Sequence, residues 1–297
     1  MKIKKYAAID IGSNAIRVLI SNVIETKEGV IFQKNALVRA PIRLGEDSFT
    51  LGEISKKSLK RMINALKAFK LLMKVHGVSY YQAFATSALR EANNSRNVVE
   101  LVKIKSGVKI EIIDGRKEAE IISNSKISDF LNTQKTFLFV DVGGGSTEFT
   151  FINEGKRICS KSFKIGTVRF INNLVDDRVW DAIRNWIVKN ARPYRKITLM
   201  GSGGNINKLF KLSKIREGKP LSIIKLNQIF LKLEALSYEE RILKFELNPD
   251  RADVIIPAAR IYLKALEWSG GQKIYVPRFG LSDGMIKYMY KNKPNKI

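Results

Sequence analysis

Cysteine and histidine are almost absent from this chain of 297 residues, which contains one of each. The single cysteine, Cys159, cannot close an internal disulfide, and one Cys with one His cannot build a Cys/His zinc site. Any bound metal ion must therefore sit on oxygen ligands, and a histidine-rich metal phosphohydrolase domain is disfavoured. His76 precedes Gly77 at the expected end of a basic helix, where we interpret it as a solvated residue rather than a catalyst.

Long apolar runs are also missing. No segment approaches the roughly 20 apolar residues that cross a bilayer. The amino-terminal MKIKKYAAIDIG begins with basic residues, as a signal peptide does, but Asp10 interrupts its apolar stretch. We therefore interpret this segment as the edge of a first strand, and we expect a cytoplasmic protein without a membrane partner.

Acidic residues are scarce relative to basic ones, because 28 Asp+Glu stand against 53 Lys+Arg and give a formal net charge of +25. Such a charge attracts polyanions: nucleic acid, anionic lipid or a phosphate polymer. If the positive charge is spread over helix surfaces, it reflects only a compositional bias. The net charge alone therefore does not identify the binding partner. Nucleic acid is disfavoured because no helix-turn-helix or RNA-binding signature is recognisable.

The chain does contain one loop pattern twice, in Tyr6–Ile20 (YAAIDIGSNAIRVLI) and Thr136–Ile152 (TFLFVDVGGGSTEFTFI). Each copy has an apolar run, an Asp, one aliphatic residue, a Gly, small or polar residues and a second apolar run, which predicts a hairpin. Glycine allows close backbone approach, and hydroxyl and amide groups add donors, so these turns can hold phosphate. One Asp-x-Gly turn is weak evidence, but two matched copies are much stronger. The predicted phosphate-binding residues of the two turns are Gly12, Ser13, Asn14, Gly143, Gly144, Gly145, Ser146 and Thr147.

Carboxylates flank both turns. Asp10 and Asp141 close the strands before the turns, and a carboxylate beside bound phosphate needs a cation such as Mg²⁺. Strand alternation points Glu148, after the second turn, out of the sheet edge. We therefore predict a Mg²⁺ or Mn²⁺ site on Asp10, Asp141 and Glu148.

The separation of the two Asp residues matches one domain repeat and favours a duplication. Strand-like and helix-like segments alternate, which implies mixed sheets with crossovers. We predict an amino-terminal domain at 1–122 and a second domain at 123–283, with a last helix at 284–297 packing back on the first. The junction is expected in the helix that Asp114 caps, which would place the two turns across a hinged cleft. The principal predicted helices are 55–76, 94–105, 116–130 and 177–190.

Nine motifs, two of which contain the turns described above, appear in a fixed order: DIGSNAIRVLI, PIRLGE, ATSALREA, IIDGRKEAEII, DVGGGSTEF, IGTVRF, GSGGN, DRADVI and FGLSDG. In these motifs the chain resembles the exopolyphosphatase/guanosine pentaphosphate phosphohydrolase family over residues 6 to about 289. That family belongs to the actin-like superfamily. The resemblance implies an α/β fold of two actin-like (ribonuclease H-like) domains, with mixed sheets flanked by helices and a cleft between them.

The resemblance also implies an activity: Mg²⁺-assisted attack of water on a terminal phosphoanhydride, releasing orthophosphate from polyphosphate or from pppGpp. It places Glu118 at the family's catalytic glutamate and Asp141 at its metal-associated aspartate. Arg43, Arg90 and the GSGGN glycines Gly203 and Gly204 match phosphate contacts. From the residues alone, Glu118 can be explained as an acidic residue in the first turn of a helix, where the helix dipole favours it. On physical grounds, a functional role is better supported for Glu148. Both compete to be the base that activates water.

Several positions depart from the family pattern, among them Lys117 in place of an acid and Ser282 in place of an arginine. They leave open a catalytically weak sensor that binds polyphosphate or an alarmone. A kinase is disfavoured, because actin-like kinases carry large inserts for which this chain has little room. A homodimer is left open, since a long polymer channel would need a second subunit.

Overall fold

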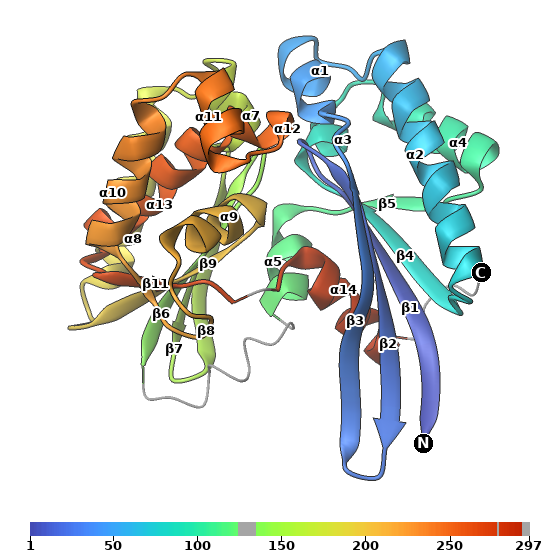
Figure 1. The fold of residues 1–297 in the computed structure, drawn as a ribbon, viewed down its shortest axis with the longest axis horizontal. Helices are drawn as coiled ribbons and strands as arrows, with labels where there is room; N and C mark the ends of the chain where they lie inside the picture. Colours follow the sequence, from blue (N-terminus) through green and yellow to red (C-terminus); the bar gives the residue numbers. More distant parts are fainter. Residues whose placement is uncertain (124–134, 278, 293–297) are drawn as a thin grey trace. The chain divides into compact units, whose positions relative to one another are not determined.

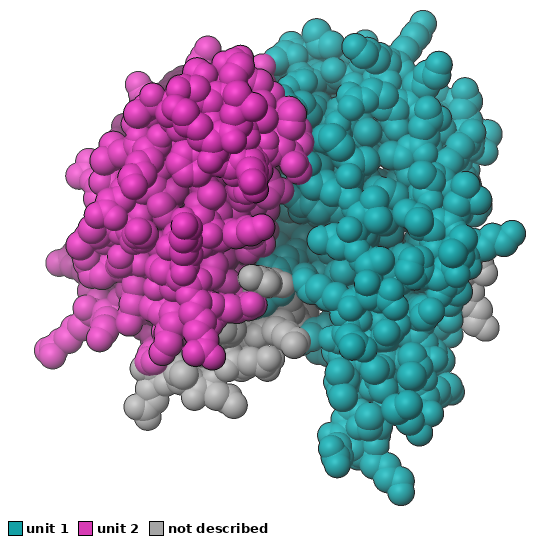
Figure 2. All heavy atoms as spheres, in the orientation of Figure 1, with its two compact units in different colours: residues 1–126, 279–297 teal, residues 127–278 magenta. Residues whose placement is uncertain are grey.

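The computed structural model describes residues 1–123, 135–277 and 279–292. The chain splits into two compact units: unit 1 comprises Met1–Lys126 with Phe279–Ile297, and unit 2 comprises Ile127–Arg278 (Figure 2). Each unit has its own sheet and its own hydrophobic core. The predicted domains, 1–122 and 123–283, stay a prediction.

Unit 1 is built on a five-stranded mixed sheet in the order β3-β2-β1-β4-β5 (Figure 1). Its strands are β1 (Lys2–Ile11), β2 (Ile16–Thr26), β3 (Gly29–Ala40), β4 (Tyr80–Ala85) and β5 (Ile110–Ile112). The first three run antiparallel, and β4 and β5 continue the sheet in parallel. Its helices are α1 (Leu44–Thr50), α2 (Lys56–Val75), α3 (Ser87–Glu91), α4 (Ser95–Ser106), α5 (Gly115–Ser123) and α14 (Leu281–Asn292).

Unit 2 is built on a six-stranded mixed sheet in the order β10-β11-β9-β6-β7-β8. Its strands are β6 (Thr136–Val142), β7 (Thr147–Asn153), β8 (Lys156–Phe163), β9 (Ile197–Ser202), β10 (Leu221–Ser222) and β11 (Lys273–Tyr275). Its helices are α7 (Thr167–Ile171), α8 (Asp177–Ala191), α9 (Gly204–Ser213), α10 (Ile223–Glu234), α11 (Tyr238–Phe245), α12 (Pro249–Ala252) and α13 (Ile255–Ser269). Two mixed sheets flanked by helices confirm the predicted fold class.

The two units repeat one order of elements. In unit 1, three antiparallel strands lead into α1 and α2 and then to β4, which lies parallel to β1. In unit 2, three antiparallel strands lead into α7 and α8 and then to β9, which lies parallel to β6. The repeat places each predicted phosphate turn at the same point of its sheet, between the first two strands.

Helix α2 shows how the sequence pattern determines packing. The Ser55 hydroxyl caps it by accepting the Ser58 N–H at 3.2 Å, and it ends at His76, before Gly77 with φ +66°. Its buried side chains repeat every three or four residues, whereas its lysines are exposed, as predicted for a solvated face; the buried residues are Ser58, Met62, Ile63, Leu66, Phe69 and Met73.

Some elements differ from the predictions. The short helices α1, α3 and α7 were not predicted, because five to seven residues carry too little periodicity to detect. Asp114 caps α5 as expected, since its carboxylate accepts the Lys117 N–H at 2.8 Å. The predicted helix 116–130 is described as α5 up to Ser123, and its remainder lies outside the described residues. No helix in the described ranges is both long and apolar enough for a bilayer.

The close packing of α14 on α5 gives a first prediction. A Cβ atom at Gly284 would lie 2.1 Å from the Ile121 carbonyl oxygen. We expect Gly284→Ala to lower the free energy of unfolding by about 1–3 kcal/mol, as overpacked sites do, measured by urea denaturation. Gly280→Ala is the control, because no atom lies within 4 Å of a Cβ there. Equal stabilities of the two variants would contradict this packing argument.

Candidate active site

The turn of unit 2 lies between β6 and β7. It is closed by a hydrogen bond from the Gly143 N–H to the Ser146 carbonyl at 3.0 Å. Within the described residues, the N–H groups of Gly144 and Gly145 donate to no protein atom. Glycine N–H groups at such a turn suit a phosphate oxygen.

The carbonyl groups of the same turn are held from behind by α7. Thr167 N–H donates to Gly143 O at 3.0 Å, and Val168 N–H donates to Gly144 O at 2.8 Å. The buried Arg169 side chain donates from Nε to Gly145 O at 2.7 Å. With its carbonyls bound on one side, the turn has a fixed shape before any ligand arrives, which lowers the cost of binding.

Two carboxylates stand side by side beside this turn. Asp141 on β6 and Glu148 on β7 are direct partners in the antiparallel register, so their side chains share one face of the sheet. Glu148 is only 2% exposed, and its Oε1 accepts hydrogen bonds from Ser146 Oγ at 2.7 Å and Ser162 Oγ at 2.8 Å. The strand alternation therefore put Glu148 beside the turn, but in a buried rather than an open position.

Strand β9 supports Asp141 from the other side. Ser202, the parallel-register partner of Asp141, donates its hydroxyl to Asp141 Oδ1 at 2.8 Å. Gly203 follows with φ +109°, and a Cβ there would lie 3.3 Å from Asp141 Oδ1. The hydroxyl of the buried Tyr262 donates a hydrogen bond to the Ser202 carbonyl. Burial, and then the negative charge of Asp141, raise the pKa of Tyr262 well above 10. The hydroxyl therefore keeps its proton and remains a donor. Gly204 begins α9, and its carbonyl accepts from Arg251 at 3.0 Å.

The turn of unit 1 has the same construction. The Gly12 N–H donates to Ala15 O at 3.1 Å. The start of α1 holds the turn, because Arg43 N–H donates to Asn14 O at 3.0 Å and Gly45 N–H donates to Ser13 O at 2.8 Å. The Ser13 and Ser87 hydroxyls are hydrogen-bonded at 3.1 Å.

The two turns differ in the residue that is paired with the turn aspartate across the hairpin. Asp10 is the direct partner of Arg17, at the position that Glu148 has opposite Asp141 in unit 2. Arg17 Nη1 donates to Asp10 Oδ2 at 3.1 Å. Burial raises the pKa of Asp10, and the charge of Arg17 partly counteracts this rise. Unit 1 therefore balances its turn carboxylate with a guanidinium, whereas unit 2 sets two carboxylates together.

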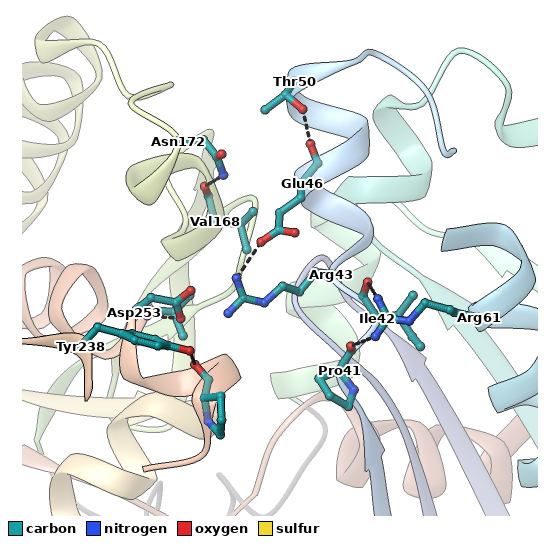
Figure 3. Close-up of polar contacts among 12 residues, drawn as sticks. Pro41, Ile42, Arg43, Glu46, Thr50, Arg61, Val168, Asn172, Tyr238 and Asp253 are labelled. Atoms are coloured by element: carbon teal, nitrogen blue, oxygen red, sulfur yellow. Dashed lines mark hydrogen bonds and ion pairs between the residues drawn. The ribbon is translucent and has the colours of Figure 1, made fainter. Parts of the chain in front are cut away.

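Arg43 occupies an unusual backbone position. It adopts the left-handed conformation, with φ 61° and ψ 43°, at the start of α1. Its guanidinium is paired with Glu46 at 2.6 Å, while Arg61 donates to the carbonyls of Pro41 and Ile42 and anchors the same loop (Figure 3). A non-glycine residue here is strained, and such strain collects at functional sites.

The other predicted residues of unit 1 lie on α3 and α5. Arg90 Nη1 donates to the Ile113 carbonyl at 2.8 Å. Glu118 is 8% exposed in the first turn of α5. The neighbouring Lys117 is paired with Glu111; burial would lower the pKa of Lys117, but the hydrogen bond and charge of Glu111 outweigh that effect and raise it.

The donor set of unit 2 fits a hard divalent cation. Asp141 and Glu148 supply carboxylate oxygens on one face, and hydroxyl groups are their side-chain neighbours. Among the described residues, no cluster of three or more His, Cys, Asp or Glu could enclose a metal ion. Mg²⁺ accepts such a site, because it is commonly held by one or two carboxylates, with water and substrate phosphate completing its shell.

Sequence reasoning missed three contributors: Arg17, Ser162 and Gly166. The first two are separated in sequence from the carboxylates they contact and are recognised only from the strand register. Gly166 lies within the IGTVRF motif, which was noted without a role. A Cβ atom there would lie 2.4 Å from the Gly144 carbonyl carbon and oxygen, so only glycine lets α7 reach the turn.

Two helix-flanked sheets, each with a glycine turn between its first two strands, define a protein of the actin-like α/β class. Residues 23–293 match the Ppx/GppA phosphatase family. The chain belongs to that family.

Similar proteins fall into two groups by length. A bifunctional 3-dehydroquinate synthase/phosphatase of Fusobacterium nucleatum is 30% identical over 98% of this chain, which spans 47% of that relative. Exopolyphosphatase 2 of Mycobacterium tuberculosis is 25% identical over 96% of this chain and 98% of the relative. A guanosine-5'-triphosphate,3'-diphosphate pyrophosphatase of Photobacterium profundum is 28% identical over 96% of this chain, which spans 59% of it.

Solved structures support the fold over the whole chain. The Ppx/GppA family member of Aquifex aeolicus is 25% identical and superposes with a TM-score of 0.77 over 99% of this chain and 100% of that chain. An exopolyphosphatase of Cytophaga hutchinsonii gives a TM-score of 0.85 at 23% identity over 98% of this chain and 99% of that chain, a likeness that shows the fold alone.

Proposed function

We propose that this chain is a phosphoanhydride hydrolase that releases orthophosphate from the end of linear polyphosphate. The observation that carries the proposal is the Asp141–Glu148 pair, in which Glu148 is buried, beside a glycine turn whose carbonyls are already bound by α7. This arrangement offers N–H donors to phosphate and carboxylates to a cation. The family to which the chain belongs supports the reaction class, and the full-length similarity of the chain to Exopolyphosphatase 2 supports polyphosphate as the substrate.

The residues have distinct proposed roles. Gly143, Gly144 and Gly145 bind phosphate oxygens through the backbone, with Ser146 and Thr147 completing the turn. In unit 1, Gly12, Ser13, Asn14, Arg43 and Arg90 are the proposed phosphate contacts, and Gly203 and Gly204 add contacts in unit 2. Because an anhydride has a good leaving group, catalysis consists mainly of positioning and charge neutralisation.

Asp141 and Glu148 would hold Mg²⁺ or Mn²⁺, and Asp10 stays a proposed ligand although Arg17 balances its charge. When bound, the ion would neutralise charge on the phosphate oxygens. Glu148 or Glu118 takes the proton of the attacking water, since each is a buried carboxylate. Glu148 directly follows Thr147, a proposed part of the phosphate turn.

The decisive experiment measures orthophosphate release from long-chain polyphosphate by the full chain with Mg²⁺, and again with EDTA. We expect release that depends on the metal and slows steeply as salt rises, because salt screens the polymer from the basic protein. Absence of release at any chain length, with either Mg²⁺ or Mn²⁺, would refute the proposal.

Conversion of pppGpp to ppGpp is the second candidate, because the Photobacterium profundum relative covers nearly this entire chain. One preparation should be compared on both substrates at equal phosphate concentration. We expect a higher kcat/KM for polyphosphate, and the reverse ranking would assign the pppGpp reaction. Tight binding of either ligand without turnover would select the sensor.

A further inference from the structure

Unit 2 has a second basic cavity, distant from its phosphate turn. The cavity has a volume of about 380 Å³. It is formed where β6, β9 and β11 begin, together with the segment that joins α8 to β9. Its lining residues are Lys135, Thr136, Pro193, Tyr194, Arg195, Lys196, Thr198, Lys273 and Tyr275.

The cavity lies at the opposite ends of the strands that carry the catalytic candidates. Thr136 begins β6, and Asp141 lies five residues further along the same strand. At about 3.3 Å per residue, this separation is about 16 Å. A ligand in the cavity would therefore not occupy the turn.

The charged residues that line this cavity, among those described, are all basic. Four lining residues are cationic: Lys135, Arg195, Lys196 and Lys273. In the part of the chain that the structure describes, none of the lining residues is acidic, and none of the four cations forms an ion pair or a side-chain hydrogen bond. Elsewhere in unit 2, cations such as Lys244 and Arg260 have carboxylate partners. Four like charges around one hollow repel each other, and a multiply charged anion would relieve that repulsion.

The uncharged part of the lining fits the same kind of ligand. Thr198 is 6% exposed and provides a hydroxyl group near the start of β9, whereas the Thr136 hydroxyl already donates to Asn153 Oδ1 at 2.7 Å. Tyr194 is fixed by stacking on Phe151, with ring centroids 6.4 Å apart and an interplanar angle of 19°. The volume lies within the range of pockets for small ligands and is too small for a folded partner.

We propose that this cavity is a second anion site, which binds a compact oligophosphate: a short inorganic chain or the triphosphate group of a nucleotide. Lys135, Arg195, Lys196 and Lys273 contact the phosphate oxygens, and the Thr198 hydroxyl adds a hydrogen bond. The site goes beyond the proposed function, because it requires no hydrolysis.

The test uses the full chain in EDTA, so that the metal-dependent reaction is absent. Tripolyphosphate is expected to protect Lys135, Lys196 and Lys273 from acetylation, read by peptide mass spectrometry. The exposed Lys219 and Lys232 of unit 2 should stay equally reactive with and without ligand. Unchanged acetylation of the three cavity lysines at millimolar tripolyphosphate would overturn the proposal.

Matched variants provide a second measurement. In calorimetry, Lys196→Ala with Lys273→Ala should weaken one class of tripolyphosphate sites at least about tenfold, since two charge-assisted contacts are lost. The control, Lys219→Ala with Lys232→Ala, removes the same charge and should bind as the wild type does. Equal binding by the two double variants would contradict the site.

Substituting GTP for tripolyphosphate distinguishes the sources of the ligand. Protection by both at similar concentrations indicates recognition of the phosphates alone, and at least tenfold tighter protection by GTP indicates that the tyrosine rings contact a base. Loss of the cavity site would leave orthophosphate release intact, so failure of this proposal is distinguishable from failure of the proposed function.

Discussion

Replacing Glu148 with Gln is expected to lower kcat for orthophosphate release by about a thousandfold, within the range for the loss of a general base. Gln has nearly the same shape and retains an oxygen that can accept from Ser146 and Ser162, which now donate to Glu148 Oε1. The negative charge beside Asp141 is lost. Since the backbone of the turn is unchanged, binding of polyphosphate should persist, as measured by calorimetry in EDTA.

A matched control separates this effect from a general charge change. Glu154, in the exposed turn between β7 and β8, can also be replaced by Gln, and kcat should then stay at the wild-type value. Glu118→Gln completes the set, because Glu118 and Glu148 compete for the role of base. A Glu148→Gln protein that turns over like the wild type would exclude Glu148 from both proton transfer and metal binding.

The second large effect is expected for Gly166→Ala. The added Cβ would lie 2.4 Å from the Gly144 carbonyl and 2.5 Å from the Gly145 nitrogen, so the turn or α7 must move. A displacement of about 1 Å at a catalytic position can cost about a hundredfold in rate, and we expect at least that loss in kcat/KM. Overpacking should also lower the free energy of unfolding by about 1–3 kcal/mol.

Comparing activity and stability shows whether the turn itself is responsible. Gly280→Ala, where a Cβ has open space, should retain both the rate and the stability of the wild type. If Gly166→Ala loses stability but its folded fraction is fully active, the turn does not position phosphate.

The local segments could be predicted from the sequence because their signals are local. The repeated Asp-x-Gly pattern located both turns, since glycine and small polar residues between two apolar runs form a short hairpin. The three- and four-residue spacing of apolar side chains located α2. Glu118 was selected as a candidate catalytic base by its family motif, and Glu148 by the alternation of side chains along a strand.

Other features of the candidate site were not predictable, because they depend on which strands pair and in which register. The sequence shows Asp10 and Asp141 as equivalents, yet one faces Arg17 and the other faces Glu148. Ser162 looks like an ordinary strand residue, and Ser202 is only one member of the GSGGN motif, until β8 and β9 bring their hydroxyls to Glu148 and Asp141. The second basic cavity likewise collects side chains from segments more than a hundred residues apart.

The sequence by itself determined that this protein has two matched glycine turns, each preceded by an aspartate, and that any metal ion must be bound by oxygen. The tertiary structure alone decided that only unit 2 sets two carboxylates against each other, and that α7 holds the back of its turn. The physical reason is that a turn is determined by residues that are neighbours in the sequence. The pairing of charges and hydroxyls across a sheet exists only after distant strands have joined in one register.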